Sequence, residues 1–366
     1  MERKYWWGLA AAVVILTGAG IWGSGHLGGG SGALPAPAPK VLPQPLATPE
    51  QQTVQPRLII GYYENPWPGT GDSSGSLPSM KAFGKAMTAV APFWYKIRPD
   101  GTLESKYSQV VYDTAKQMGL AVYPLMINQG KAIDTILADS RGRTKVIDNI
   151  VKEITARNYD GVNIDFEQLA PKHRLNLNMF AAELYLRLKP INKTVIFSVF
   201  PQIDVTEDVS GAYDYVELAK NADFLQIMTY DKHWPGSDPG PIAPIDWYEE
   251  NIQYAIERAG GPHKIIVGVG AYGYDWPREG EADYITYVEA TLRAERNAAN
   301  IQFDAVAKAP HFSYGGRNVW FEDVQSTGAK LDVIAKHNPA GIAIWRIGQE
   351  QPEMWREIEK KFPRNR

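Results

Sequence analysis

Short apolar runs alternate with longer segments of helical pattern over residues 57–366, and this alternation limits the fold more than any other feature of the sequence. Residues 177–188, for example, space their apolar side chains as one face of an amphipathic helix does. Strands that alternate with helices predict a parallel sheet covered by helices. Eight such units fit a closed α/β fold, the (β/α)8 TIM barrel. The eight expected strands are residues 58–63, 89–97, 121–128, 159–169, 194–201, 224–231, 264–271 and 341–347.

One segment does not fit a simple barrel. Residues 275–323 follow the seventh expected strand and are too long for a plain loop. The segment contains several tyrosine, tryptophan and phenylalanine residues that could form a small core, among them Tyr284, Tyr287, Phe303, Tyr314, Trp320 and Phe321. We therefore expect a small insertion subdomain here, forming one wall of a cleft.

The N-terminal residues are unlike the rest of the chain. Arg3 and Lys4 precede an apolar run that extends to Trp22, nearly long enough to cross a bilayer. Residues 1–22 therefore predict a signal anchor, with a cleaved signal peptide as the alternative. Residues 23–56 are rich first in glycine and serine and then in proline, which predicts an extended linker. We expect an extracytoplasmic protein tethered to the membrane, or a secreted one if the signal is cleaved.

Composition excludes several kinds of partner and site. A net charge of −3 provides no basic footprint for nucleic acid. The chain has no cysteine, and its six histidines are scattered without metal-binding spacing, so we predict no metal and no cofactor. We expect a monomer.

Residues 159–169 carry the clearest chemical pattern. Apolar residues alternate with Asn163, Asp165 and Glu167, which places the polar side chains together on one face of a strand. A buried carboxylate is costly without a partner or a ligand. Two carboxylates on one face suit acid/base chemistry, although the same pattern also fits an ordinary barrel strand with acids at its solvated end.

The run Asp160-Gly161-x-Asn163-x-Asp165-x-Glu167 resembles the catalytic strand of glycoside hydrolase family 18, the chitinase-like family. The usual family pattern is Asp-Gly-x-Asp-x-Asp-x-Glu, so Asn163 stands where most members have Asp. The spore-cortex-lytic N-acetylglucosaminidase subgroup shares this departure, and the chain resembles that subgroup more closely than true chitinases. The resemblance covers roughly residues 58–362.

The resemblance implies roles for these residues. Glu167 would protonate the glycosidic oxygen, and Asp165 would accept a hydrogen bond from the substrate's acetamide N–H. The acetamide oxygen itself would act as the nucleophile. Asn163 can orient Asp165 by hydrogen bonding but cannot titrate, so the departure affects the pH profile more than the reaction.

Two further segments match the family pattern. Residues 226–231 match Gln-x-Met-x-Tyr-Asp. By resemblance, Tyr230 would hold the acetamide carbonyl, Met228 would line the pocket and Asp231 would brace it. Trp345, near the end of the eighth expected strand, would form the floor under the cleaved sugar. Weaker candidates for contacts with the substrate are Tyr62, Tyr63, Trp94, Tyr272, Asp275 and Trp276.

The predicted function is therefore that of a retaining, substrate-assisted glycosidase. It would cut β-1,4 linkages in polymers that contain N-acetylglucosamine, with peptidoglycan as the first substrate and chitin oligomers as the alternative. A non-catalytic sugar-binding protein on the same fold is the rival hypothesis. Such lectins typically lack the catalytic Glu, whereas this chain has Glu167.

Overall fold

The computed structural model of the chain describes residues 58–65 and 75–363. The expected signal segment of residues 1–22 and the linker of residues 23–56 lie outside these ranges. Within the described ranges, no helix combines the length and the apolar character that crossing a membrane requires.

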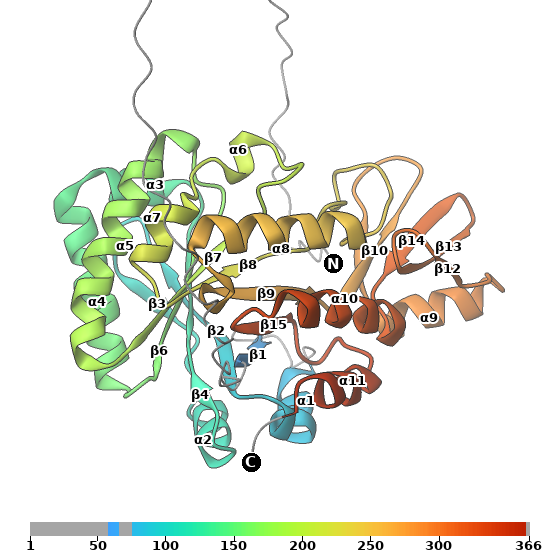
Figure 1. The fold of residues 1–366 in the computed structure, drawn as a ribbon, viewed down its shortest axis with the longest axis horizontal. Coiled ribbons are helices and arrows are strands. Elements are labelled where there is room, and N and C mark those ends of the chain that lie inside the picture. The colour runs from blue at the N-terminus through green and yellow to red at the C-terminus, as the bar shows by residue number, and fades with distance from the viewer. Residues whose placement is uncertain (1–57, 66–74, 364–366) are drawn as a thin grey trace, which may run out of the picture. The chain divides into compact units, whose positions relative to one another are not determined.

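A closed parallel barrel forms the centre of the fold (Figure 1). The ring closes because β1 pairs in parallel with β2 on one side and with β15 on the other. β4 and β5 both pair with β2 and together fill one position of the ring, so the predicted (β/α)8 barrel is confirmed. The parallel strands are β1 (Leu58–Tyr63), β2 (Ala89–Ile97), β4 (Ala121–Val122), β5 (Leu125–Asn128), β6 (Gly161–Asp165), β7 (Thr194–Val199), β8 (Phe224–Ile227), β9 (Ile265–Gly270) and β15 (Gly341–Trp345).

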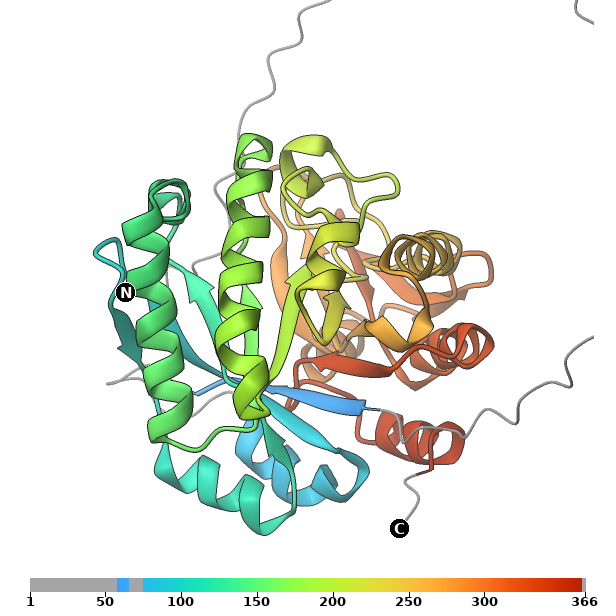
Figure 2. The same ribbon diagram turned by 60° about the vertical axis from the view of Figure 1, so that its left-hand side comes forward.

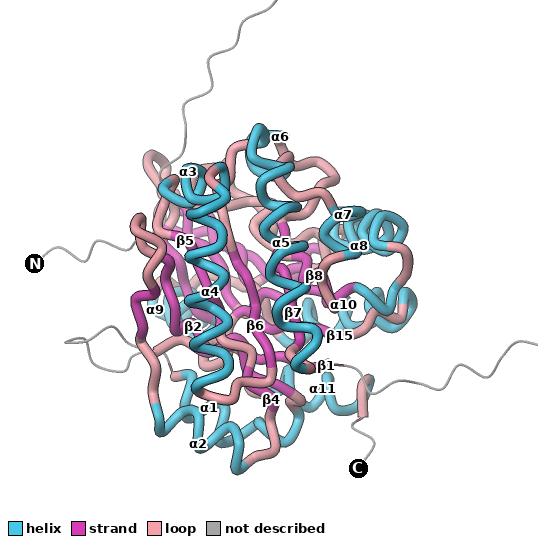
Figure 3. Tube along the Cα trace, turned by 90° about the vertical axis from the view of Figure 1, so that its left-hand side faces the viewer, coloured by secondary structure: helices cyan, strands magenta, loops and turns pink. Residues whose placement is uncertain are grey.

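Helices surround this sheet (Figure 2). Figure 3 shows α4 and α5 side by side against the outer face of the strands. The α-helices are α1 (Ser76–Phe83), α2 (Gln109–Gln117), α3 (Ala132–Ala138), α4 (Ser140–Ala156), α5 (Arg174–Leu188), α6 (Glu207–Ser210), α7 (Tyr215–Lys220), α8 (Ile245–Ala259), α9 (Tyr287–Arg296), α10 (Val324–His337) and α11 (Glu353–Lys361). Short 3-10 helices are η1 (Gly84–Ala86), η2 (Pro171–His173), η3 (Lys189–Ile191) and η4 (Pro262–Lys264).

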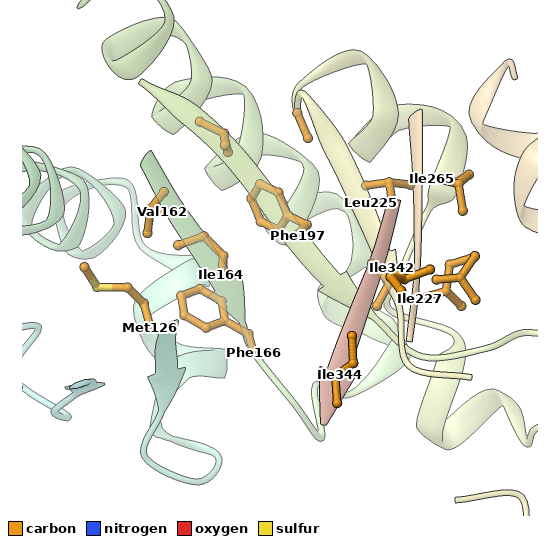
Figure 4. Close-up of a cluster of buried hydrophobic side chains, with 14 of the residues drawn as sticks. Met126, Val162, Ile164, Phe166, Phe197, Leu225, Ile227, Ile265, Ile342 and Ile344 are labelled. Atoms are coloured by element: carbon orange, nitrogen blue, oxygen red, sulfur yellow. The ribbon is translucent and has the colours of Figure 1, made fainter. Parts of the chain in front are cut away.

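The barrel has two hydrophobic layers, one on each face of its strands. The outer layer lies between strands and helices and contains Val162, Ile164 and Phe166 of the catalytic segment (Figure 4). The inner layer fills the barrel with side chains from most of the strands: Ile60, Tyr62, Ala89, Ala91, Tyr123, Leu125, Ile196, Ile266 and Ala343. Alternation along each strand assigns successive residues to the two layers.

The Asp-Gly pair before β6 has a structural role. The Asp160 carboxylate accepts a hydrogen bond from the Val122 N–H at 2.7 Å and pairs with Lys116 at 3.0 Å. A Cβ on Gly161 would lie 2.2 Å from the Thr194 carbonyl oxygen, so only glycine allows β6 and β7 to approach this closely. These two residues fix where β6 begins and therefore which of its residues reach the barrel mouth, the end at which the parallel strands finish.

An antiparallel sheet and one helix, α9, follow β9. The sheet has the order β11-β10-β14-β13-β12. Its strands are β10 (Tyr272–Trp276), β11 (Asp283–Thr286), β12 (Gln302–Asp304), β13 (Ala309–Tyr314) and β14 (Arg317–Phe321). The sheet therefore begins at Tyr272, and the expected boundary at Asp275 falls inside β10.

Strand ends differ from the expectation in several places. The expected strand of residues 121–128 is interrupted between β4 and β5. β6 ends at Asp165 and β8 ends at Ile227, so Glu167 and Tyr230 lie on the segments that follow these strands. Both segments contain a residue in the left-handed region, Gln168 with φ 57° and Asp231 with φ 60°, which turns the backbone away from the strand direction.

Candidate active site

The polar side chains of β6 lie on one face of the strand, as the sequence predicts. Asn163 is completely buried and Asp165 is 7% exposed, and neither belongs to the outer hydrophobic layer. Glu167, just beyond the strand, is partly exposed. The three side chains therefore run from the barrel interior to its mouth, and Glu167 lies nearest to solvent.

The backbone around Glu167 is held from two sides. The Asn128 side chain accepts a hydrogen bond from the Glu167 N–H at 2.9 Å and donates one to the Glu167 carbonyl at 3.0 Å. The Tyr213 hydroxyl donates to the Phe166 carbonyl at 2.6 Å. The sequence indicates a site role for Asn128, because it is a polar residue at the end of an expected strand, whereas no sequence pattern points to Tyr213.

The carboxyl groups of the site have pKa values above those of ordinary carboxyl groups. Burial raises the pKa of Asp165. Burial also raises the pKa of Glu167 well above its usual range, and the negative charges of Asp165 and Asp231 raise it further. Glu167 therefore holds a proton at a pH where an ordinary glutamate has lost it, which is what a general acid requires.

Asn163 does not orient Asp165, contrary to our expectation. Its amide N–H donates to the Tyr62 hydroxyl at 2.7 Å, and its carbonyl accepts from Ser198 at 3.0 Å. Tyr62 in turn donates to Gln226 at 2.9 Å. The Oδ1 atom of Asp165 is buried and has no hydrogen-bond partner. A buried acceptor of this kind is costly, and a donor on a bound ligand would satisfy it.

Tyr230 and Asp231 stand close to these acids. Burial raises the pKa of the Tyr230 hydroxyl well above its usual range, and the charge of Asp165 contributes, so this group remains a donor. Asp231 accepts hydrogen bonds from Tyr272 at 2.5 Å and Tyr274 at 2.9 Å. Burial raises the pKa of Asp231 to about 6, although these two hydrogen bonds act in the opposite direction. Tyr272 is therefore a buried hydrogen-bond partner of Asp231 and does not contact the substrate as we predicted.

Trp345 ends β15 inside the ring of strands. Its side chain is partly exposed and meets Tyr62 edge to face, with ring centroids 5.2 Å apart. The peptide bond between Trp345 and Arg346 is cis. Met228, after β8, is 7% exposed. Both residues lie at strand ends on the side of the barrel that carries Asp165.

Five predicted substrate contacts are incorrect. Tyr63, Trp94, Tyr272 and Trp276 are at most 3% exposed and belong to the outer hydrophobic cluster, and Asp275 is completely buried, so they present no surface to a ligand. On β1 the inward aromatic residue is Tyr62, not Tyr63. On β2 the register shifts between Phe93 and Tyr95, and Phe93 packs against the inner layer while Trp94 packs outside.

No metal site accompanies these residues. Among residues 58–65 and 75–363, no three His, Cys, Asp or Glu side chains are grouped so that they could hold a metal ion.

Comparisons with known proteins agree with this arrangement. The cortical fragment-lytic enzyme of Bacillus anthracis is 30% identical over 301 residues, which cover 77% of this chain and 70% of that protein. The crystal structure of the spore cortex-lytic enzyme SleL of Bacillus cereus matches with a TM-score of 0.76 and 29% identity, covering 84% of this chain and 74% of that one. A chitinase from Chromobacterium violaceum also gives a TM-score of 0.76, at 26% identity, covering 84% of this chain and 99% of that one.

The family model for glycosyl hydrolases family 18 matches residues 59–350, which include all the barrel strands except the first residue of β1, as well as Asp165 and Glu167. This confirms the resemblance drawn from residues 160–167. The chain is a glycoside hydrolase and belongs to glycosyl hydrolases family 18.

Proposed function

We propose that the chain is a retaining, substrate-assisted N-acetylglucosaminidase. The observation that carries this proposal is the buried Oδ1 of Asp165, which has no hydrogen-bond partner and lies beside a glutamate with a raised pKa. An acetamide N–H of the substrate would supply the missing donor. An ordinary retaining glycosidase would instead need a second carboxylate free to attack the sugar.

The reaction would take two steps. In the first, Glu167 gives its proton to the glycosidic oxygen as the bond from that oxygen to C1 breaks. The acetamide oxygen of the same sugar bonds to C1 from the opposite face, while Asp165 accepts a hydrogen bond from the acetamide N–H and offsets the developing positive charge. In the second step, water attacks C1, passes a proton to the Glu167 carboxylate and displaces the acetamide oxygen. Two inversions leave the anomeric configuration unchanged.

Peptidoglycan is the proposed substrate. The B. anthracis and B. cereus relatives are named for lysis of cortical fragments and of spore cortex, and both cover more than two thirds of the chain. Chitin oligomers are the second candidate, supported by the similar C. violaceum chitinase. We further propose that residues 1–22 tether the enzyme outside the cytoplasm and that the enzyme acts as a monomer.

The test uses Glu167→Gln and substrates with and without the N-acetyl group. Wild-type enzyme should cleave N-acetylglucosamine oligomers with retention, visible as the first-formed anomer by NMR, and should leave the de-acetylated oligomers intact. Glu167→Gln should lose cleavage and still bind the glycan. Glu295→Gln on the exposed side of α9 is the matched control and should behave as wild type.

Three results would count against the proposal. Equal cleavage of de-acetylated substrate would exclude the acetamide as nucleophile. Unchanged turnover in Glu167→Gln would exclude Glu167 as the acid. Binding without cleavage by the wild-type chain would favour the sugar-binding alternative.

A further inference from the structure

The outer side of α5 carries apolar side chains that the barrel does not use. Leu175 is 72% exposed, Met179 is 41% exposed and Leu186 is 73% exposed. Their spacing places them on one stripe of the helix, together with the half-buried Ala182. A different side of α5 supplies the buried residues that pack on the barrel. Single exposed apolar residues are common, whereas a stripe along one helix indicates a contact surface.

α4 lies beside α5 and presents a basic stripe (Figure 3). Arg141, Lys145 and Lys152 are exposed, and their spacing places them on one side of α4 as well. Arg141 and Lys152 form no ion pair with another described residue. Lys145 lies near Asp100, in the turn before β3 (Leu103–Ser105). We call the apolar stripe of α5 and the basic stripe of α4 together the α4–α5 face.

The α4–α5 face differs in charge from the chain as a whole. α4 and α5 contain six Arg and Lys residues and three Asp and Glu residues, although the whole chain has a net charge of −3. Each of the three acids already pairs with an arginine: Asp148 with Arg187, Glu183 with Arg143, and Glu153 with Arg157. These pairs leave Arg141 and Lys152 as cations without a counterion among the described residues.

We propose that the α4–α5 face docks on the surface of an anionic lipid bilayer. Leu175, Met179 and Leu186 would enter the boundary between headgroups and acyl chains, and the cations of α4 would meet the anionic headgroups beside them. Apolar side chains next to Lys and Arg are what helices that lie in a membrane interface present. A purely acidic partner would leave the leucines exposed, and an uncharged one would leave the cations unused. An anionic bilayer matches both stripes along one flat surface.

Docking would orient the barrel mouth without covering it. α4 and α5 lie on the outer wall of the barrel, whereas Glu167 and Trp345 lie at the ends of strands. The linker expected over residues 23–56 would span roughly 110 Å when fully extended, so a tether alone would not fix this orientation. The inference goes beyond the proposed glycosidase function, because it concerns where the enzyme is held and not the reaction.

The experiment follows one position of the α4–α5 face in the full-length chain. Because the chain has no cysteine, Ala182→Cys provides a single thiol between Met179 and Leu186. Glu295→Cys provides the matched thiol on exposed α9, at the opposite end of the molecule (Figure 1). Each thiol carries a fluorescent dye, and the protein is reconstituted in vesicles whose acyl chains bear a quencher. The vesicles contain either phosphatidylcholine alone or phosphatidylcholine mixed with anionic phosphatidylglycerol.

We expect lipid quenching of the dye at position 182 in the anionic vesicles and little in the neutral ones, with no quenching at position 295 in either. Arg141→Gln and Lys152→Gln should each lower the ratio of docked to undocked protein about five-fold, and added salt should act in the same direction. Leu186→Gln should also lower this ratio. Val306→Gln is its matched control, since Val306 is an apolar residue that is 80% exposed outside the face.

Three results would overturn the inference. The first is an unquenched dye at position 182 in anionic vesicles. The second is equal quenching in neutral and anionic vesicles, because the cations would then have no part in docking. The third is shielding of position 182 that grows with protein concentration in the absence of lipid, which would show that a second copy of the chain covers the stripe. All of these variants should cleave soluble glycans as wild type does, so each of these results leaves the proposed glycosidase intact.

Discussion

Asp165 and Asp275 are both buried aspartates, yet the chain treats them in opposite ways. Asp275, on β10 of the insertion sheet, is completely buried. Its carboxylate pairs with Arg293, accepts from Arg317 at 2.6 Å, and accepts from the Tyr314 hydroxyl at 2.6 Å. Asp165 is 7% exposed, and its Oδ1 has no partner.

The number of hydrogen-bond donors around each carboxylate distinguishes an aspartate that is buried for stability from one that is buried for function. A buried carboxylate that is surrounded by donors holds its neighbours in place, and losing it exposes several unpaired cations. A buried carboxylate left short of donors costs free energy in the folded state, and beside a glutamate at the barrel mouth a bound ligand can offset that cost. On this basis Asp275 belongs to the fold of the insertion, and Asp165 belongs to the reaction.

The largest expected effect comes from Asp165→Asn. The amide keeps the size of the side chain but cannot offset positive charge on the acetamide, so kcat should fall on the order of 10³-fold. Because the substitution removes a poorly solvated carboxylate, the melting temperature should stay equal or rise. Steady-state kinetics and calorimetry of the same samples measure both quantities. A lower melting temperature with normal kcat would make Asp165 structural and end the contrast with Asp275.

Asp275→Asn should give the reverse pattern. Removing one partner of a buried ion-pair group leaves Arg293 and Arg317 without their main acceptor, so the free energy of unfolding should fall by about 3–5 kcal/mol. Denaturant unfolding measures this loss. Asp283→Asn is the matched control, since Asp283 contacts the same two arginines but its side chain is 57% exposed. The control substitution should lower the free energy of unfolding by less than about 1 kcal/mol. Equal losses in the two variants would show that Asp275 contributes no more to stability than the exposed Asp283.

The sequence predicted the barrel and the acids because both depend on strong local patterns. On β6 one face is apolar and the other carries Asn163 and Asp165, so alternation alone identifies the inward face. On β1 both faces are apolar or aromatic, as is usual for a parallel strand covered on both sides. Alternation there separates Tyr62 from Tyr63 without indicating which of them points inward, so the sequence leaves both as candidates, and only the packed barrel shows that Tyr62 is the inward one.

Other features of the site depend on long-range contacts that no local pattern contains. On β2, Trp94 follows the alternation that places Ala89, Ala91 and Phe93 inside, but the register shifts between Phe93 and Tyr95, so that Tyr95 packs outside as well. Asn128 and Tyr213 hold the backbone of residues 166 and 167 across large separations in sequence. Asn163 contacts Tyr62 and Ser198 rather than Asp165, which only the packed barrel interior determines.

Glu167→Gln tests whether the second acid also costs free energy. Its pKa is raised in the folded state, so the ionised form destabilises the fold, and the cost appears as the pH rises above the unfolded value near 4.3. Glutamine avoids this cost. The variant should therefore match wild type at pH 4 and be more stable than wild type at pH 8, with a higher melting temperature there. Glu295→Gln should show no pH-dependent gain, and a loss of stability in Glu167→Gln at pH 8 would contradict the assignment.

The smallest expected effect comes from Asn163→Asp, which adds a third carboxyl group to the same strand face. The new carboxyl group would lie in the completely buried position beside Tyr62 and Ser198, where its ionised form would place a negative charge close to Asp165. A nearby negative charge raises the pKa of Asp165 and of Glu167 together. Since Asp165 must be ionised and Glu167 protonated, both limbs of the profile of kcat/KM against pH should move to higher pH, by about one unit. Ser198→Ala, which removes a partner of Asn163 without adding charge, is the control and should leave both limbs in place. If the pH profile of Asn163→Asp is the same as that of wild type, a charge at position 163 does not affect the pKa of Asp165 or of Glu167. The wild-type asparagine would then have no influence on the protonation of these two acids.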